Sequence, residues 1–283
     1  MKKSSMLKSW LPLFVGGFIT FIITLLIHLQ NQHELKLHTQ KLVTEATHFI
    51  TQRFNYYEYG LIGTRGAIMA VGADKITRPQ FEQYINSRDL KHEFPGALGF
   101  GYILRVPKDE EAAFVAAARK DGAPNFNVRY LSEHDQDRFI IKYVYPLEKN
   151  AQAVGLDIGS ETNRRSTALA AAIEKRAYLT EPITLVQADK KTRRGVLILL
   201  PIFKNGDIPS TQEARRDGVY GWSYAVLVID DVLSTVPDSL KNTSFTLTNL
   251  AEQVPFYSFQ NAASDALIAH KTSAKIQVLG QSW

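Results

Sequence analysis

The 283-residue chain contains no cysteine. A disulfide framework is therefore excluded, and a domain of about 250 residues does not need one because its core is large enough. An apolar fraction of 45% and a charged fraction of 22% exclude a mainly disordered protein. The length exceeds a typical domain of about 100–200 residues, so we expect one large or two small folded units.

Catalytic signatures are also absent. The sequence has no G-x-S-x-G, P-loop, H-E-x-x-H or dinucleotide fingerprint. The stretch "HDQD", from His134 to Asp137, has ligand-type side chains, but neighbouring residues of one polar loop rarely converge on a metal ion. We therefore predict no enzymatic activity in this segment, no cofactor and no metal. The net charge of +5 is spread along the chain, so nucleic acid is not an expected partner.

A third absence lies near the N-terminus, where no charged residue occurs between Lys8 and Glu34. Within this interval the run "WLPLFVGGFITFIITLLIHL", residues 10–29, matches the roughly 20 residues that cross a ~30 Å hydrocarbon core. A cleaved signal peptide is the alternative, but its apolar region spans about 7–15 residues before a small-x-small site. We predict an uncleaved transmembrane helix over residues 10–29.

The lysines before this run predict the topology. Lys2, Lys3 and Lys8 precede the span, so the positive-inside rule places residues 1–9 in the cytoplasm. The remainder of the chain then lies in the periplasm or the extracellular space, with the span in the inner (cell) membrane.

A long helical segment follows the span. Between Gln32 and Val71 the apolar positions recur at three- and four-residue steps, which indicates one face of a helix. We expect residues 30–65 to form a stalk continuous with the span. The apolar face either packs on the chain's own domain or pairs with a second protomer. We predict a parallel homodimer through the face that carries Leu35, Leu42, Ala46 and Phe49.

Helices and strands then alternate in mixed order, which predicts an α+β fold. Helix signals cover residues 76–90, 108–122 and 161–176. The helix at 76–90 begins with Thr77, Pro79 and Gln80, a capping-box pattern. We expect one lobe over residues 66–205, and a linker with a smaller lobe over residues 206–283. The chain stops at Trp283 inside an apparent strand region, so we expect a longer protein with a second span.

Aromatic side chains alternate along two of the predicted strands. Phe100 and Tyr102 occupy alternate positions of "FPGALGFGYILRVP", residues 94–107, and Tyr143 and Tyr145 do the same in "RFIIKYVYPL". Alternate strand residues point to one face of a sheet. Such a face forms either a filled core or an aromatic ligand pocket.

An ordered series of motifs resembles the CHASE domain. The series consists of the Phe94-Pro95-Gly96 turn, the Tyr143–Asn150 passage with its proline, the Gly155-Leu156-Asp157 turn, the paired Arg164 and Arg165, and the strand start at Thr180 and Pro182. The resemblance runs from about Gly66 to Phe203. CHASE domains are extracellular sensory modules of membrane-bound histidine kinases and nucleotide or diguanylate cyclases.

This resemblance implies a stalk helix and two PAS-like lobes, with a small-molecule ligand bound in the membrane-distal lobe. It also implies a cytoplasmic output domain outside these residues. Thr180 matches a position that lies beside the ligand in plant cytokinin receptors. We therefore predict ligand contacts from Phe100, Tyr102, Tyr143, Tyr145 and Thr180.

The nature of the ligand is narrowed by one departure from the family. Plant cytokinin receptors use a pocket carboxylate, whereas the matching region here, Asp137 to Ile141, places an apolar residue at that position. A purine would leave hydrogen-bond donors unpaired, at about 1–3 kcal/mol each, so an adenine-type ligand is disfavoured. A membrane-anchored periplasmic enzyme and a structural tether are the alternatives to a receptor.

Overall fold

The computed structural model describes residues 3–186, 192–260 and 271–283. Its α-helices are α1 (Lys3–Val71), α2 (Arg78–Asn86), α3 (Leu90–Glu93), α4 (Glu111–Lys120), α5 (Leu147–Asn150), α6 (Thr162–Glu174), α7 (Gln212–Gly218) and α8 (Ile229–Val232). Its strands are β1 (Ala97–Val106), β2 (Arg129–Tyr130), β3 (Arg138–Tyr145), β4 (Leu156–Asp157), β5 (Tyr178–Leu179), β6 (Ile183–Val186), β7 (Thr192–Phe203), β8 (Val219–Val228), β9 (Phe245–Asn249), β10 (Val254–Phe259), β11 (Gln277–Val278) and β12 (Gln281–Ser282).

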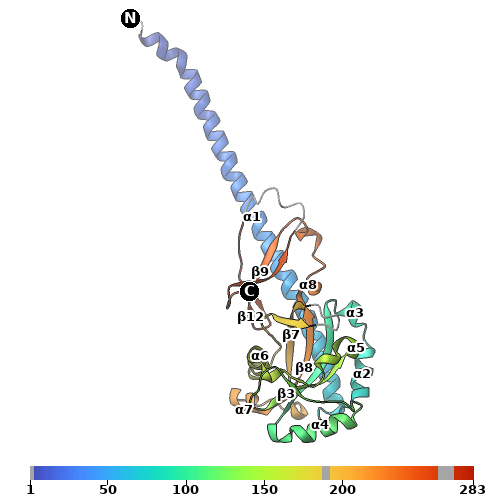
Figure 1. Ribbon diagram of the computed structural model, residues 1–283. Helices are drawn as coiled ribbons and strands as arrows, with labels where there is room; N and C mark the ends of the chain where they lie inside the picture. The colour runs from blue at the N-terminus through green and yellow to red at the C-terminus, as the bar shows by residue number, and fades with distance from the viewer. Residues whose placement is uncertain (1–2, 187–191, 261–270) are drawn as a thin grey trace.

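Helix α1 is a continuous rod of 69 residues, about 100 Å long at 1.5 Å per residue. Its N-terminal part projects away from the rest of the molecule (Figure 1) and is long and apolar enough to cross a membrane. Its C-terminal part buries Phe54 and Leu61 against the sheet domain. The helix stops at Gly72, whose φ of 105° suits glycine and ends the regular hydrogen-bond pattern.

The main sheet has eight strands. Seven follow the order β2-β4-β3-β1-β8-β7-β5, and β6 pairs with the N-terminal part of β7, from Thr192 to Gly195. The β2–β4 pair is parallel and the other pairs are antiparallel. The structure thus confirms a mixed fold of helices and strands that follows a long apolar N-terminal helix. Strand β8 lies between β1 and β7, so the expected lobe boundary at residues 205/206 falls between neighbouring strands of one sheet.

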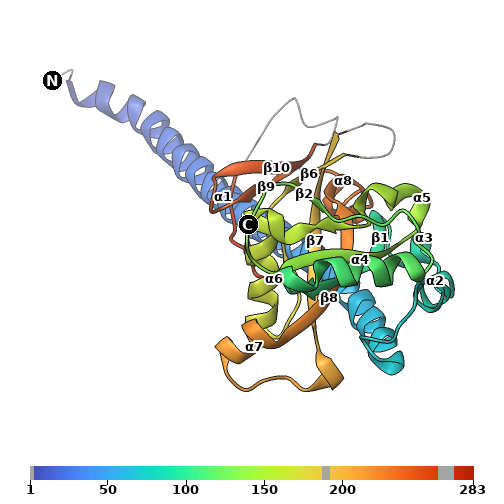
Figure 2. The same cartoon turned by 60° about the horizontal axis from the view of Figure 1, so that its bottom comes forward.

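Two separate clusters of buried side chains cover the two faces of this sheet. The α1-side core lies between the sheet and α1, and includes Phe54, Phe100, Tyr102 and Leu227. The α6-side core lies between the sheet and α6, and its buried members are Ile103, Phe139, Ile141, Val144, Ile158, Ala168, Ala171, Ala172, Ile183, Leu197, Leu199, Phe203, Val219, Trp222, Tyr224 and Val226. The turned view in Figure 2 brings α4 and α6 to the front.

Two small hairpins complete the C-terminal part of the chain. Strands β9 and β10 form one, and β11 and β12 form the other. The β9–β10 hairpin lies beside α1, between the projecting part of that helix and the main sheet (Figure 1). Trp283 packs on Phe54 of α1, with ring centroids 5.3 Å apart. These contacts attach the C-terminal segment to the stalk.

The helix signals were accurate. Helix α2 begins after Thr77 with the expected capping box, in which the Gln80 side chain accepts a hydrogen bond from the Thr77 amide at 3.0 Å. Helix α6 starts within one residue of its expected position. Its N-cap is Glu161, whose carboxylate accepts hydrogen bonds from the amides of Asn163 and Arg164. The stalk and the span form one helix, as predicted.

Candidate ligand-binding region

The structure brings the four predicted aromatic residues together. Tyr102 of β1 lies opposite Tyr143 of β3, and Phe100 lies opposite Tyr145. The rings of Tyr102 and Tyr143 are 6.2 Å apart between centroids. Phe100, Tyr102 and Tyr143 belong to the α1-side core, and the half-buried Tyr145 packs against it. The alternation in the sequence therefore identified one real cluster on one face.

The hydroxyl groups of Tyr102 and Tyr143 already have partners inside the protein. Tyr102 donates to the backbone carbonyl of Ala73 at 2.9 Å, and Tyr143 donates to that of Ile76 at 2.9 Å. Tyr143 also contacts the carboxylate of Asp121. Burial raises the pKa of Tyr143 well above its usual range, so the hydroxyl stays protonated. These bonds hold the loop between α1 and α2 against the sheet.

Thr180 lies apart from the aromatic cluster. It follows β5, and β7 and β8 separate β5 from β1 in the sheet. The Thr180 side chain is fully buried, and its hydroxyl accepts a hydrogen bond from the Leu197 amide at 3.0 Å. The structure therefore places the predicted residues in two locations rather than one.

The α6-side core contains a hydroxyl that the sequence analysis overlooked. Tyr224 of β8 is fully buried, and its hydroxyl has no hydrogen-bond partner among the described residues. Burial raises the pKa of Tyr224 well above its usual range, so the group is a neutral donor and acceptor. By contrast, the Trp222 indole donates to the Ala168 carbonyl of α6 at 2.8 Å.

Gly101 makes room for the Tyr224 ring. A Cβ atom at Gly101 would lie 2.2 Å from the nearest ring carbon of Tyr224 and 2.4 Å from the backbone oxygen of Tyr143. Glycine within a strand often marks such a close approach. The glycines of "GFGY" were therefore the one signal in the sequence for an aromatic side chain lying across β1.

A buried polar network lies at the β4 edge of the sheet. Asp157 is fully buried and accepts hydrogen bonds at 2.8 Å from the backbone amides of Phe139 and Gly159. Its other oxygen is 2.8 Å from His134 Nε2. The guanidinium of Arg165 lies over the Phe139 ring at 4.4 Å. This network fixes the segment before α6 to β3.

The "HDQD" stretch uses its ionisable side chains separately. His134 pairs with Asp157 at 2.8 Å, Asp135 with Lys108 at 2.5 Å, and Asp137 with Arg105 at 2.8 Å. Within residues 3–186, 192–260 and 271–283, no group of three or more potential metal ligands comes together. The physical reason is that each side chain points toward a different element.

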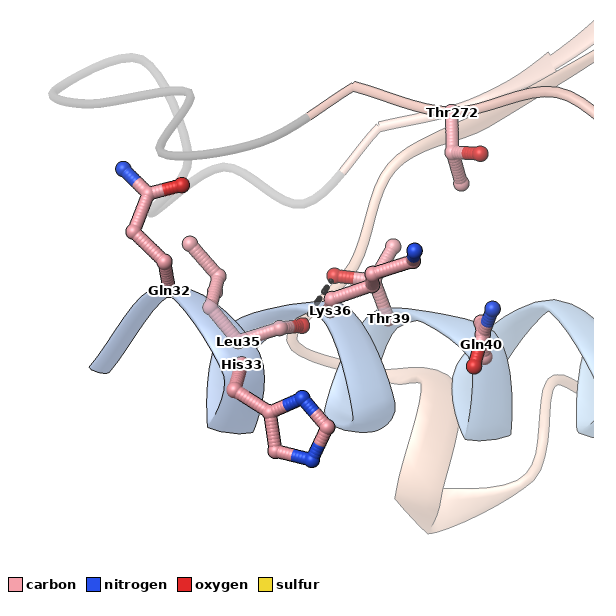
Figure 3. Close-up of a pocket in the computed structure, with 7 residues that line it drawn as sticks. All are labelled: Gln32, His33, Leu35, Lys36, Thr39, Gln40 and Thr272. Atoms are coloured by element: carbon pink, nitrogen blue, oxygen red, sulfur yellow. Dashed lines mark hydrogen bonds between the residues drawn. The ribbon is translucent and has the colours of Figure 1, made fainter. Parts of the chain in front are cut away.

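A hollow of about 320 Å³ lies along the exposed part of α1 (Figure 3). Its lining residues are Gln32, His33, Leu35, Lys36, Thr39, Gln40 and Thr272. None of them is buried, and Thr39 already donates its hydroxyl to the Leu35 carbonyl at 2.7 Å. This hollow therefore offers no desolvated polar group to a ligand.

One comparison with known proteins identifies a family. The CHASE domain model matches residues 74–263. The match extends well past Phe203, where the resemblance in the sequence was expected to end. The comparison with curated proteins gives no match.

Among solved structures, the chain is similar to an extracellular ligand binding receptor from Desulfohalobium retbaense. That match has 13% sequence identity and a TM-score of 0.48, and it covers 85% of this chain. The chain spans 38% of that receptor's length.

The family match covers more than half of the chain and includes the whole main sheet. CHASE domains are sensory and non-catalytic, which agrees with the lack of catalytic motifs. The apolar N-terminal helix is consistent with a membrane protein whose sensory domain faces outward. The chain belongs to the CHASE domain family and is an extracellular sensory domain.

Proposed function

We propose that this chain is the ligand-sensing part of a transmembrane receptor of the inner (cell) membrane. It binds a small organic molecule in the sheet domain and transmits binding through α1 to a cytoplasmic output domain outside these residues. The membership in the CHASE family and the continuity of α1 support this proposal. A rod that joins a membrane span directly to a sensor carries displacement with little loss.

The observation that carries the ligand site is the hydroxyl of Tyr224. A buried hydroxyl without a partner destabilises a fold by about 1–3 kcal/mol, and a bound molecule that offers an acceptor removes this penalty. Tyr224 belongs to the same buried cluster as Phe139, Trp222 and the alanines of α6. The ligand is therefore a mostly apolar, planar or amphipathic molecule with at least one polar atom, bound on the α6 side of the sheet.

The four aromatic residues predicted from the sequence define a second location for the same function. Phe100, Tyr102, Tyr143 and Tyr145 lie on one face of the neighbouring strands β1 and β3, and aromatic rings suit stacking on a planar ligand. A ligand there has to displace the hydrogen bonds of Tyr102 and Tyr143 to the loop between α1 and α2. We therefore propose the α6 side as the ligand site in preference to this aromatic cluster.

We further propose that two PAS-like lobes build this sensor. The antiparallel strands β3, β1, β8 and β7 with α6 form the membrane-distal lobe. The C-terminal hairpins form the membrane-proximal lobe. The position of the β9–β10 hairpin nearer to the projecting part of α1 supports this assignment (Figure 1).

A thermal-shift screen of the full chain in detergent micelles tests the ligand site. Tyr224→Phe, Tyr143→Phe and Thr180→Val are screened beside the parent, with Tyr59→Phe on the exposed face of α1 as control. Because ligand stabilisation tracks affinity, a compound that stabilises the parent and Tyr143→Phe but not Tyr224→Phe places the site on the α6 side. A compound that stabilises every variant equally contradicts both locations.

Signalling through α1 is simplest if two copies move relative to each other. We propose a parallel homodimer through the stalk. Leu35 is exposed and Leu42 and Ala46 are half-buried, whereas Phe49 packs against the α1-side core. The contact is therefore made mainly at Leu35, because Leu42, Ala46 and Phe49 are already partly covered by the chain's own residues.

Single-cysteine cross-linking in membranes tests this dimer, and the chain has no cysteine to interfere. Cross-links are expected with helical periodicity from residue 35 to 46, and none at Phe54, which is fully buried. Absence of cross-links at every exposed position supports a monomeric tether. If the purified chain turns over a substrate, and substitution of polar residues in a cleft abolishes this turnover, the result supports the membrane-anchored enzyme instead.

A further inference from the structure

A second cleft lies where the outer edge of the main sheet meets the β9–β10 hairpin. Its volume is about 150 Å³. It is lined by Pro182, Ile183, Thr184, Arg194, Asn249, Glu252, Val254 and Phe256. These residues come from β6, β7 and the hairpin, so the cleft bridges two parts of the domain that are far apart in the sequence. Tyr224, which carries the ligand site proposed above, does not line this cleft, although Ile183 of the α6-side core does.

Asn249 determines which kind of hydrogen-bonding group a ligand of this cleft must carry. The residue is 2% exposed, and its amide nitrogen Nδ2 has no hydrogen-bond partner among the described residues. The other side-chain atom, Oδ1, accepts a hydrogen bond from the Ala251 amide at 2.9 Å. That bond fixes the orientation of the amide group, because a flipped amide would place two donors against each other. Asn249 therefore presents only a donor to the cleft.

Arg194 adds a second group that can only donate. Its guanidinium donates one bond to the Pro255 carbonyl at 3.4 Å, which leaves further N–H groups for a ligand because arginine carries five. Two donor-only groups in one cleft require an acceptor-rich ligand, and a carboxylate meets this requirement best. Glu252 is exposed on the rim and favours a ligand that also carries a donor.

We propose that this cleft binds a small carboxylate that bears an amino or hydroxyl group next to the carboxyl carbon. The carboxylate accepts hydrogen bonds from Asn249 and Arg194, and the neighbouring donor faces Glu252. The cleft, with a volume of about 150 Å³, has room for a molecule of the size of glycine or lactate.

Binding there has a physical route to the stalk. Phe256 lines the cleft, and its ring centroid is 5.0 Å from that of Trp283. Trp283 in turn lies 5.3 Å from Phe54 of α1. A ligand in the cleft contacts both β7 and the hairpin. It therefore restrains the packed rings of Phe256, Trp283 and Phe54, the last of which belongs to α1.

Isothermal titration calorimetry on the full chain in detergent micelles tests the proposal, with glycine, sodium lactate and sodium acetate as probes at constant ionic strength. Glycine or lactate is expected to bind saturably and more tightly than acetate. Asn249→Asp keeps the bond from Ala251 but replaces the donor by an anionic oxygen. It is expected to weaken binding about tenfold or more, since hydrogen bonds to charged groups contribute about 1.5–3 kcal/mol.

Two further variants make the result decisive. Arg194→Gln removes the exposed guanidinium and is expected to weaken binding, whereas Asn205→Asp makes the same chemical change as Asn249→Asp at an exposed site and leaves binding unchanged. If Asn249→Asp fails to fold by circular dichroism, Arg194→Gln alone decides. No saturable binding of any probe, or binding that these cleft variants leave unaltered, overturns the proposal and indicates that water alone satisfies Asn249.

Discussion

The two faces of the main sheet differ in how their buried hydroxyl groups are used. In the α1-side core, Tyr57, Tyr102, Tyr143 and Tyr257 each donate to a backbone carbonyl. In the α6-side core, Tyr224 has no partner among the described residues. Both faces are packed with apolar side chains, so burial alone does not distinguish them.

This difference separates a structural face from a candidate recognition face. Buried polar groups in native proteins are almost always hydrogen-bonded, and an exception calls for an explanation such as a ligand. The α1 side fastens the stalk and the loop after it to the sheet. The α6 side retains a hydroxyl that the described residues leave unpaired, whereas the unpaired group of the α1-side core is the indole N–H of Trp283. Four substitutions test this contrast.

The largest effect is expected from Tyr102→Ala, which opens a cavity in the α1-side core and removes the bond to Ala73. Truncation of a buried aromatic side chain costs about 3–5 kcal/mol of unfolding free energy. Urea denaturation of the full chain in detergent, followed by tryptophan fluorescence, measures it. Tyr59→Ala, at a side chain that is 69% exposed, is the control and changes stability by less than about 0.5 kcal/mol. Equal losses at both positions refute a closed α1-side core.

A smaller loss is expected from Gly101→Ala, because the new methyl group collides with the Tyr224 ring and the Tyr143 carbonyl. Overpacking of this kind costs about 1–3 kcal/mol. Gly66→Ala is the matched control, since nothing lies within 4 Å of a Cβ there. That control stabilises α1 by about 0.5–1 kcal/mol. A neutral Gly101→Ala shows that Tyr224 can leave its position freely.

The smallest effects give the sharpest comparison. Tyr143→Phe loses the bond to the Ile76 carbonyl and is expected to destabilise the fold by about 1–2 kcal/mol. Tyr224→Phe removes a hydroxyl without a partner together with the penalty of burying it, so the unliganded chain is expected to lose no stability and to gain up to about 1–3 kcal/mol. The same denaturation assay measures both. Similar losses for the two variants show that the Tyr224 hydroxyl is already satisfied, and they remove the basis for a site on the α6 side.

Much of the architecture was predictable because its signals are local. The uncharged run after Lys8 predicts a membrane-spanning helix, and the three- and four-residue spacing up to Val71 predicts that the helix continues as a stalk. Thr77 and Gln80 mark the start of α2 by a capping interaction within four residues. The alternation of Tyr143 and Tyr145 identifies their shared face, because side-chain direction in a strand follows from the chain itself.

Only the tertiary structure determines which face of the main sheet is structural and which is the candidate ligand-binding face. The sheet order places β8 between β1 and β7, and this pairing of strands over a hundred residues apart brings Tyr224 across Gly101. It also separates Thr180 from the aromatic cluster by two strands. Whether a buried hydroxyl or amide finds a partner depends on distant backbone groups, as at Tyr102, Tyr224 and Asn249. The sequence determined the elements and their apolar faces, whereas the long-range pairing determined which polar groups remain available to a ligand.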